Sequence, residues 1–285
     1  MCRFGQNKES VADRGEHSAD LQHLLDKIYR ERGFDFREYK ETTLTRRLGR
    51  RLRARGAGSY AEYARVLDRD QTEYDRLFKD LTINVTSFFR DDWAFRALEE
   101  LVLPELIHKE VNTGNGIRVW SAGCATGEET YSIAMLASEV LGAERNNREV
   151  SIIGTDIDTE ALKRAQEGLF SSKEVEGIPP ALLERYFVSE NKGYRVKASV
   201  REMVAFETHN LSSGPPYHDL DLVVCRNLLI YFTSRLQERV IKGFYSALRE
   251  DGFLLLGKAE VPIGETKRMF QCVDKRARLY RKHIR

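Results

Sequence analysis

The sequence predicts an all-α domain at the N-terminus, followed by a larger α/β domain built on a mostly parallel sheet. Up to about residue 85, apolar residues recur only at helical spacing, and no strand signal occurs. After Pro104, short β-type runs alternate with helical patterns, which is typical of a parallel sheet covered on both faces. A chain of 285 residues with 41% hydrophobic residues can build both domains.

The first domain is expected at 19–85, as a small helical bundle. Residues 1–18 are polar and are expected to form a flexible tail. Asp20 is expected to cap a first helix, whose apolar side chains are Leu21, Leu24, Leu25 and Ile28. Further helical patterns cover 43–55, 60–67 and 72–81. A linker helix is expected at 86–104.

The α/β domain is expected at 105–285, with strands at 117–122, 150–154, 203–207, 220–225 and 253–256. Helices are expected between most of them, at 131–141, 159–167 and 234–248. One stretch breaks the alternation, because a short helix begins at Pro180 and is followed by runs 186–188 and 194–196 around a polar turn. This pattern predicts a hairpin in a small inserted β-subdomain at about 171–202. In such sheets, ligands bind beyond the carboxyl ends of the strands.

Charge and cysteine usage narrow the class of protein. Basic residues number 46 and acidic residues 44, so the formal net charge is +2. This balance argues against a surface that binds nucleic acid as a whole. The four cysteines form no Cys-x-x-Cys pair and no zinc-ligand pattern, which favours a reducing compartment and no metal. Without a signal core or an apolar span, we expect a cytoplasmic protein with no membrane insertion, and a monomer by default.

The segment VWSAGCATGEE, at 119–129, follows a strand and opens a helix. Its Gly123 lets the backbone turn sharply and approach a ligand closely, although many α/β turns carry glycine for geometry alone. The next strand ends at Asp156, where a carboxylate can accept hydrogen bonds from both hydroxyls of a ribose. Asp158 suits the N-cap of the following helix better. The combination fits either a nicotinamide dinucleotide or S-adenosylmethionine.

The acids of the loop favour the second ligand. Glu128 and Glu129 lie at the helix N-terminus, where a dinucleotide would place its pyrophosphate, and two carboxylates would repel it. They suit a ligand with a cationic amino group and a sulfonium. The loop is similar to the Gly-Cys-Gly-Thr-Gly loop of S-adenosylmethionine-dependent methyltransferases. It departs from that pattern at Ser121 and Ala125.

Four motifs make the chain resemble the CheR family of chemotaxis receptor glutamate methyltransferases, from about residue 20 to its end. They are NVTSFFR at 84–90, WSAGCATGEE at 120–129, TDIDTE at 155–160 and CRNLLIYF at 225–232. The resemblance implies a class I S-adenosylmethionine-dependent methyltransferase (Rossmann-like) domain with an inserted small β-subdomain, preceded by an all-α domain. It also implies methyl transfer from S-adenosylmethionine to the γ-carboxylate of glutamates in chemoreceptors. The products would be glutamate methyl esters and S-adenosylhomocysteine.

The resemblance carries functional residues over by position. Together with Gly123 of the loop, the implied cofactor contacts are Asn84, Thr86, Arg90, Glu129, Asp156, Asn210, Leu211, Arg226 and Asn227. Arg90 and Tyr231 are the implied catalytic residues. A glutamate with a pKa of about 4.3 is already ionised at neutral pH, so no general base or metal is expected. We expect alignment and exclusion of water to supply the catalysis, with Arg90 orienting the substrate or the cofactor carboxylate.

One basic segment is a candidate docking surface. Between Leu44 and Gly58 the chain has six arginines and no acid, at 46, 47, 50, 51, 53 and 55. Leucines at 44, 48 and 52 are expected to form the buried stripe, with the arginines spread over the exposed faces. Such a run is usually a solvated helix face, but it also suits nucleic acid or an acidic protein. We expect Arg46, Arg50 and Arg53 to dock the acidic methylation helices of a chemoreceptor.

Other functions stay open on the sequence alone. One is a methyltransferase that acts on another substrate, such as RNA or a receptor outside chemotaxis. No basic groove interleaved with aromatic residues of the kind that stacks bases is visible, which disfavours RNA. Another is a cofactor-binding module without activity. A dinucleotide oxidoreductase is the least favoured, because of the acids in the loop.

Overall fold

The computed structural model describes residues 11–82, 84–114, 116–142 and 149–283. The chain divides into two compact units, Met1–Thr82 and Ile83–Arg285. Each unit has its own cluster of buried apolar side chains. The two are described separately below.

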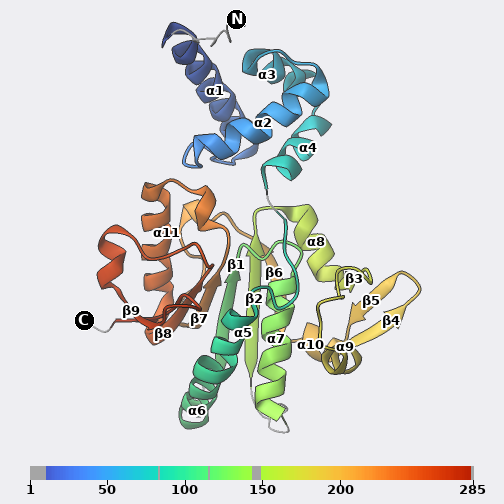
Figure 1. Cartoon of the computed structure of the whole chain (residues 1–285), viewed down its shortest axis with the longest axis vertical. Helices are drawn as coiled ribbons and strands as arrows, with labels where there is room; N and C mark the ends of the chain where they lie inside the picture. The colour runs from blue at the N-terminus through green and yellow to red at the C-terminus, as the bar shows by residue number, and fades with distance from the viewer. Residues whose placement is uncertain (1–10, 83, 115, 143–148, 284–285) are drawn as a thin grey trace, which may run out of the picture. The chain divides into compact units, whose positions relative to one another are not determined.

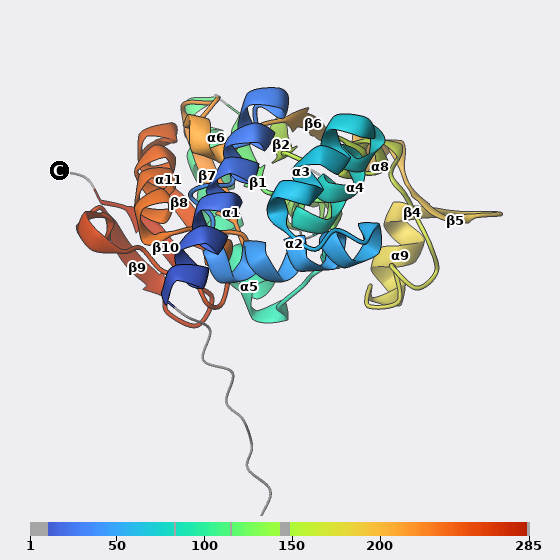
Figure 2. The same ribbon diagram turned by 90° about the horizontal axis from the view of Figure 1, so that it is seen from above.

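The described residues of the first unit, 11–82, form four helices: α1 (Val11–Arg32), α2 (Glu41–Arg55), α3 (Tyr60–Arg69) and α4 (Thr72–Leu81). They gather round one core, which includes Ile28, Leu48, Tyr63 and Leu77 (Figure 2). Gly56 ends α2 in the left-handed conformation, with φ of 65°. The helical patterns of the sequence are therefore confirmed in this unit.

The start of the first helix differs from the expectation. α1 begins at Val11, so Asp20 lies inside the helix and does not cap it. The segment Val11–Ala19 contains no proline and several good helix formers, and nothing in it forces a start at Asp20. Part of the expected tail is thus helical, and residues 1–10 of that tail lie outside the described residues.

The second unit is built on a seven-stranded sheet in the order β6-β2-β1-β7-β8-β10-β9 (Figure 1). The strands are β1 (Ile117–Ala122), β2 (Val150–Asp156), β6 (Val204–Thr208), β7 (Leu220–Cys225), β8 (Leu248–Leu256), β9 (Phe270–Asp274) and β10 (Leu279–Lys282). Pairing is parallel from β6 to β8, while β10 is antiparallel to both of its neighbours. The predicted α/β class with a mostly parallel sheet is confirmed.

Helices cover both faces of this sheet. Ile117 and Val119 of β1 belong to the core on the face of the sheet that α7 (Glu128–Leu141) covers. The next residue, Trp120, points to the opposite face, because side chains alternate along a strand. Trp120 packs edge-on against Phe244 of α11 (Ser234–Ala247), with ring centroids 5.4 Å apart. α8 (Thr159–Glu167) packs beside β2 and β6.

A small three-stranded sheet lies outside the main one, in the order β3-β5-β4 (Figure 1). It consists of β3 (Leu169–Phe170), β4 (Phe187–Glu190) and β5 (Gly193–Val196), flanked by α9 (Pro180–Tyr186) and α10 (Ala198–Arg201). The hairpin predicted for this region is confirmed. Phe88 packs edge-on against Phe170 and Phe187, so the segment before the first strand is anchored on this subdomain.

The expected linker helix at 86–104 is placed differently. Helical structure begins only at α5 (Asp92–Ala97), passes through a π-helical turn, η1 (Leu98–Val102), and continues as α6 (Leu103–Thr113). Pro104 lies in the first turn of α6. A proline has no N–H and clashes with the carbonyl four residues before it, and a wider π turn at this point accommodates both effects.

Candidate functional site

Four neighbouring strands end at one edge of the sheet, and the predicted site residues follow each of them. In the parallel register, Ala122 of β1 pairs with Thr155 of β2. Ser121 pairs with Val224 of β7, and Asp156 pairs with Thr208 of β6. The register therefore brings together Gly123, Asp156, the segment that starts at His209, and Arg226.

The glycine loop turns through left-handed backbone at three positions. Gly123 has φ of 81° and donates its N–H to the Thr155 carbonyl at 2.7 Å. Gly127 has φ of 93°, and a Cβ there would lie 2.8 Å from the Cβ of Ala165. Between them, Ala125 also has positive φ, 49°, which an alanine rarely adopts. The loop thus keeps a glycine-like path at the position where the sequence lacks the expected glycine.

Asp156 is held by the backbone on both oxygens. Its Oδ2 accepts the N–H of Ala125 at 2.9 Å, and its Oδ1 accepts the N–H of Asp158 at 2.9 Å. Burial raises the pKa of Asp156 above its ordinary value, and these N–H groups oppose the rise. Each oxygen keeps a further lone pair, so this carboxylate can still accept hydrogen bonds from ligand hydroxyls.

Asp158 caps α8, as its position in the sequence suggests. Its Oδ1 accepts the N–H groups of Glu160 and Ala161, each at 3.0 Å. Its Oδ2 accepts a hydrogen bond from the Asn84 side chain at 2.7 Å. Asn84 is therefore tied to the loop that follows β2, directly beside Asp156.

Glu129 is the acid on the other side of the loop. Ser121 Oγ donates to its Oε1 at 2.9 Å, and Arg226 Nη1 lies 3.3 Å from its Oε2. Burial raises the pKa of Glu129, and the charge of Arg226 opposes the rise more than the charge of Arg90 does. The neighbouring Glu128 is also buried, but its carboxylate accepts the Thr126 hydroxyl at 2.6 Å. Only Glu129 is held by a side chain from another strand end.

Arg226 joins two motifs that are far apart in the sequence. Its Nη2 donates to the Arg90 carbonyl at 2.6 Å and to Asp91 Oδ2 at 2.9 Å. Its guanidinium also lies over the Phe95 ring, 5.4 Å from the centroid. The Nε of this buried side chain has no hydrogen-bond partner among the described residues. Arg226 thus fixes the segment 84–91 against the end of β7.

Arg90, a predicted catalytic residue, lies in the segment 84–91 between two residues with strained backbone. Phe89 and Asp91, on either side of it, have φ of 49° and 60°, and the Phe89 N–H donates to Ser132 Oγ at 3.0 Å. Arg90 is half-buried and donates one N–H to the Val85 carbonyl at 2.8 Å. Non-glycine residues in this conformation cluster at functional sites.

Four further predicted residues lie at the same edge with different contacts. Asn210 caps a short 3₁₀ turn, η3 (Leu211–Ser213), by accepting the Ser212 N–H at 3.0 Å. Leu211 is buried. Tyr231 ends a second 3₁₀ turn, η4 (Leu229–Tyr231), and is half-buried. Thr86 is half-buried as well, and within the described part of the chain neither hydroxyl has a hydrogen-bond partner.

Glu260 is a residue of this region to which the sequence reasoning gave no role. It is buried, and its carboxylate accepts three backbone N–H groups, those of Gly257, Asn227 and Ile230. Burial raises its pKa, and these N–H groups oppose the rise. The signal in the sequence is an acid four residues after a strand end, in Gly257-Lys-Ala-Glu260.

The arginines of α2 divide into two sets, which corrects the expectation that all six are exposed. Arg47 donates to the Asp80 carbonyl at 2.6 Å, and Arg51 and Arg55 pair with Glu73 and Asp70 at 2.6 and 3.0 Å. A second set forms no ion pair with any described side chain and is exposed: Arg46, Arg50 and Arg53. Arg55 is exposed as well but is paired with Asp70, so of the arginines of α2 the second set alone combines exposure with a charge that no described side chain pairs.

Two absences hold for the described residues. None of their His, Cys, Asp and Glu side chains form a group of three or more that could hold a metal ion. Among their helices, none combines the length and the apolar character that a membrane span needs.

Comparison with known proteins assigns both units. The family described as "CheR methyltransferase, all-alpha domain" matches residues 19–82, and "CheR methyltransferase, SAM binding domain" matches residues 84–279. A "Chemotaxis protein methyltransferase" of Borreliella burgdorferi is 32% identical over 247 residues, covering 85% of this chain and 87% of that protein. "Chemotaxis protein methyltransferase 2" of Pseudomonas aeruginosa is 34% identical over 247 residues, covering 85% and 86%.

A third relative is much longer than this chain. An uncharacterised 104.1 kDa protein of Rhodobacter capsulatus is 37% identical over 226 residues, and the match covers 79% of this chain but 24% of that protein. The two family domains, by contrast, account for nearly all of the sequence, in the order expected of the fold. The chain belongs to the CheR methyltransferase family, and it is an S-adenosylmethionine-dependent methyltransferase.

Proposed function

We propose that this enzyme transfers the methyl group of S-adenosylmethionine to glutamate γ-carboxylates of chemoreceptors, which yields glutamate methyl esters and S-adenosylhomocysteine. The observation that carries the proposal is the pair of half-buried acids Glu129, in the first turn of α7 after β1, and Asp156, at the end of the adjacent β2, in a domain of this family. The names of the two relatives that this chain nearly spans support a chemotaxis substrate. Free cysteines at 124, 225 and 272 support a cytoplasmic reaction, and we take the enzyme to be a monomer.

The chemistry of the side chains fits the cofactor. Asp156 would accept the ribose hydroxyls, because each of its oxygens keeps a lone pair beside the backbone hydrogen bond. Glu129 would face the cationic amino group of the methionine end. Gly123 would allow close approach of the backbone, and further contacts would come from Asn84, Thr86, Arg90, Asn210, Leu211, Arg226 and Asn227. When bound, S-adenosylmethionine supplies an activated methyl group on its sulfonium.

Catalysis then rests on how the chain aligns the nucleophile. The substrate glutamate is ionised at neutral pH, so no residue has to remove a proton. Arg90 would orient a carboxylate with its remaining N–H groups, since one is used by Val85. Tyr231 would present its ring to the sulfonium as the O–CH₃ bond forms and the S–CH₃ bond breaks. Orientation and exclusion of water can supply most of the acceleration.

The receptor would dock on the exposed arginines of α2. Arg46, Arg50 and Arg53 lie at i, i+4 and i+7, so they share one face of the helix. With no ion pair to described side chains, their charge is available to an acidic protein surface. Arg47 donates to the Asp80 carbonyl, and Arg51 and Arg55 pair with the carboxylates of Glu73 and Asp70, so these three would not take part.

One experiment tests both halves of the proposal. Calorimetry should show micromolar binding of S-adenosylmethionine and S-adenosylhomocysteine, and Asp156→Asn should weaken both because the ribose loses a charged acceptor. Tritiated S-adenosylmethionine and chemoreceptor-containing membranes should then give base-labile label on the receptor. Cofactor binding with label on RNA or on no protein would refute the substrate assignment. Absence of cofactor binding would refute the site.

A further inference from the structure

The loops that follow β7 and β8 are joined through the carboxylate of Glu260. Its Oε2 accepts the Gly257 N–H at 2.7 Å and the Asn227 N–H at 3.0 Å. Its Oε1 accepts the Ile230 N–H at 3.2 Å. The side chain is only 4% exposed, and among the described residues no basic side chain pairs with it. The negative charge is therefore balanced by backbone dipoles alone.

Close backbone packing shows that this contact is built into the fold. A Cβ at Gly257 would lie 2.6 Å from the Asn227 nitrogen and 2.6 Å from Glu260 Oε2, so only glycine fits there. Asn227 itself has φ of 60°, a left-handed conformation. The three N–H groups would be unsatisfied without the carboxylate, and leaving a buried N–H without an acceptor is unfavourable.

The turn after β7, which Glu260 holds by its backbone, carries predicted site residues. Asn227 and Ile230 lie within the turn from Arg226 to Tyr231, and both ends of that turn are candidate site residues. Arg226 in turn holds the Arg90 carbonyl and lies 3.3 Å from Glu129. A shift of the turn would therefore move groups on three sides of the site at once.

We infer that Glu260 is a positioning residue, which sets the turn 226–231 in the geometry that cofactor binding and methyl transfer require. The inference rests on the proposed function. Glu260 acts through the backbone of Asn227 and Ile230 and touches neither cofactor nor substrate. Both oxygens of Glu260 accept hydrogen bonds from backbone N–H groups. Glutamine has the same shape but only one oxygen acceptor, so it cannot replace Glu260 here.

Glu260→Gln tests this directly. The amide keeps the shape, but its NH₂ must face at least one backbone N–H. We expect the Kd for S-adenosylhomocysteine to rise at least about tenfold, or about 1.4 kcal/mol. We expect kcat to fall by at least the same factor while the KM for the receptor stays unchanged. Glu260→Asp keeps the charge with one carbon fewer, and it should recover part of the loss.

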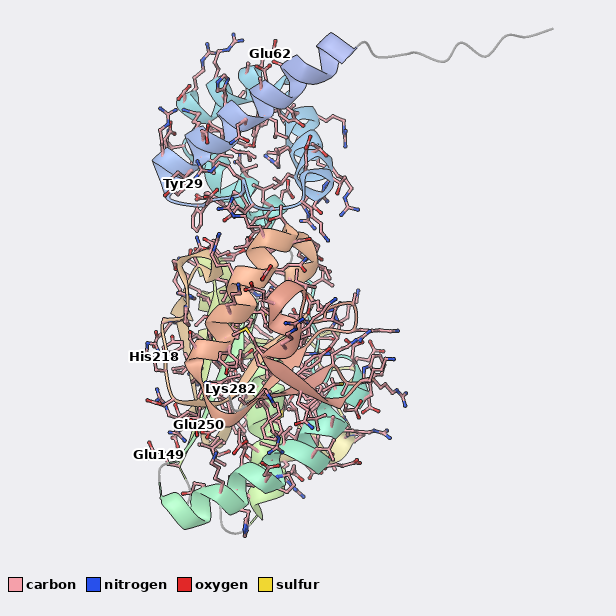
Figure 3. The ribbon with its side chains drawn as sticks, turned by 90° about the vertical axis from the view of Figure 1, so that its left-hand side faces the viewer. Tyr29, Glu62, Glu149, His218, Glu250 and Lys282 are labelled. Carbon is pink, nitrogen blue, oxygen red and sulfur yellow. The ribbon has the colours of Figure 1, made fainter. Side chains whose placement is uncertain are left out.

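The matched control is Asp221→Asn, at the opposite end of β7. Asp221 is also buried, and it accepts the Arg118 N–H at 2.9 Å and pairs with Arg249 at 3.0 Å. Glu149 before β2 and His218 before β7 mark this amino-terminal end of the sheet (Figure 3). Asp221→Asn should lower the thermal stability but leave the Kd for S-adenosylhomocysteine unchanged.

A spectroscopic reading separates positioning from stability. With ¹⁵N-glycine labelling, the Gly257 amide should resonate downfield in the wild type, as expected of an N–H bonded to a carboxylate, and should shift upfield in Glu260→Gln. An ordinary wild-type Gly257 resonance would overturn the inference, even if the variants failed to fold. So would a Glu260→Gln enzyme with wild-type Kd and kcat. Failure of receptor methylation in the wild type would refute only the proposed function, because the Kd and the resonance need no receptor.

Discussion

Glu129 and Asp156 show how the site trades stability for binding. Burial raises the folded pKa of each carboxyl above the ordinary values of 4.5 and 3.8. A group with a raised folded pKa favours folding most below its unfolded pKa, and that contribution is lost as the pH rises through the folded pKa. At neutral pH, therefore, the ionised pair disfavours the ligand-free fold. A bound cationic ligand would balance this negative charge and so stabilise the folded protein.

A neutral replacement of Glu129 should separate the two effects. Glu129→Gln should raise the melting temperature of the ligand-free protein at pH 7, because no charge is buried, while Arg226 keeps its pair with Asp91. The Kd for S-adenosylmethionine should rise at least about tenfold. Calorimetry and thermal unfolding give the two readings. The exposed Glu160→Gln serves as control, and a lower melting temperature with an unchanged Kd would show that this charge serves the fold alone.

The same carboxylates predict how cofactor affinity depends on pH. Protonation of Glu129 and Asp156 removes the negative charge that a cationic ligand needs, and their raised pKa values bring protonation closer to neutrality. The Kd for S-adenosylmethionine should therefore rise as the pH falls from about 7.5 to about 5.5. S-adenosylhomocysteine keeps the cationic amino group that Glu129 would face, so its Kd should rise as well, but by less because the sulfonium charge is absent. A Kd that stays constant over this pH range for both ligands would count against Glu129 facing the amino group.

At residue scale, the sequence revealed site residues whose chemistry follows from position in a motif. Asp158 suits a helix cap by position, and the structure shows that cap. The position of Asp156 at a strand end could be predicted. Its hydrogen bond from the Ala125 N–H could not, because nothing in the sequence signals an alanine with left-handed backbone. Glu260 stayed unexplained because its partners are backbone N–H groups from a distant turn.

At the scale of elements, α2 shows what periodicity can and cannot reveal. The stripe of Leu44, Leu48 and Leu52 was predictable: the first two are buried, and Leu52 is half-buried against the same core. The division of the arginines was not, because it depends on Asp70, which lies between α3 and α4, and on Glu73 and Asp80 of α4, which meet α2 only in the folded unit. Glu73 is fully buried between Arg51 and Tyr63, which binds all three helices together.

The exposed face of α2 gives a prediction about substrate recognition. Arg50→Glu with Arg53→Glu should raise the KM for the receptor at least about tenfold while the Kd for S-adenosylhomocysteine stays constant, because two favourable charge contacts become repulsive. Arg65→Glu with Arg69→Glu reverses the same charge on exposed positions of α3, at i and i+4, where Arg50 and Arg53 lie at i and i+3. This control should leave the KM near wild type. Equal effects from both pairs would mean that net charge, not a specific face, attracts the receptor.

At the scale of the whole molecule, the class and order of the elements were predictable, but the last strands of the sheet were not. β9 and β10 come from runs of only five and four residues, Phe270–Asp274 and Leu279–Lys282, which are too short to give a sustained alternating pattern. They form the far edge of the sheet, where burial on two faces is not required. The four strands that carry the site are β1, β2 and β7 in the centre of the sheet, together with β6. The β-type runs that predict these four strands were clear in the sequence.

The division of the chain after Thr82 predicts that binding and recognition can be separated. Each unit has a core of its own, and all predicted cofactor contacts lie between Asn84 and Asn227. The fragment 83–285 should fold and bind S-adenosylhomocysteine with the Kd of the full chain. Its kcat/KM for the receptor should fall at least about a hundredfold, or about 2.7 kcal/mol, because the arginine face of α2 is gone. If the folded fragment methylates the receptor as well as the full chain does, recognition lies in the methyltransferase unit. If the fragment folds but fails to bind the cofactor, the first unit completes the site.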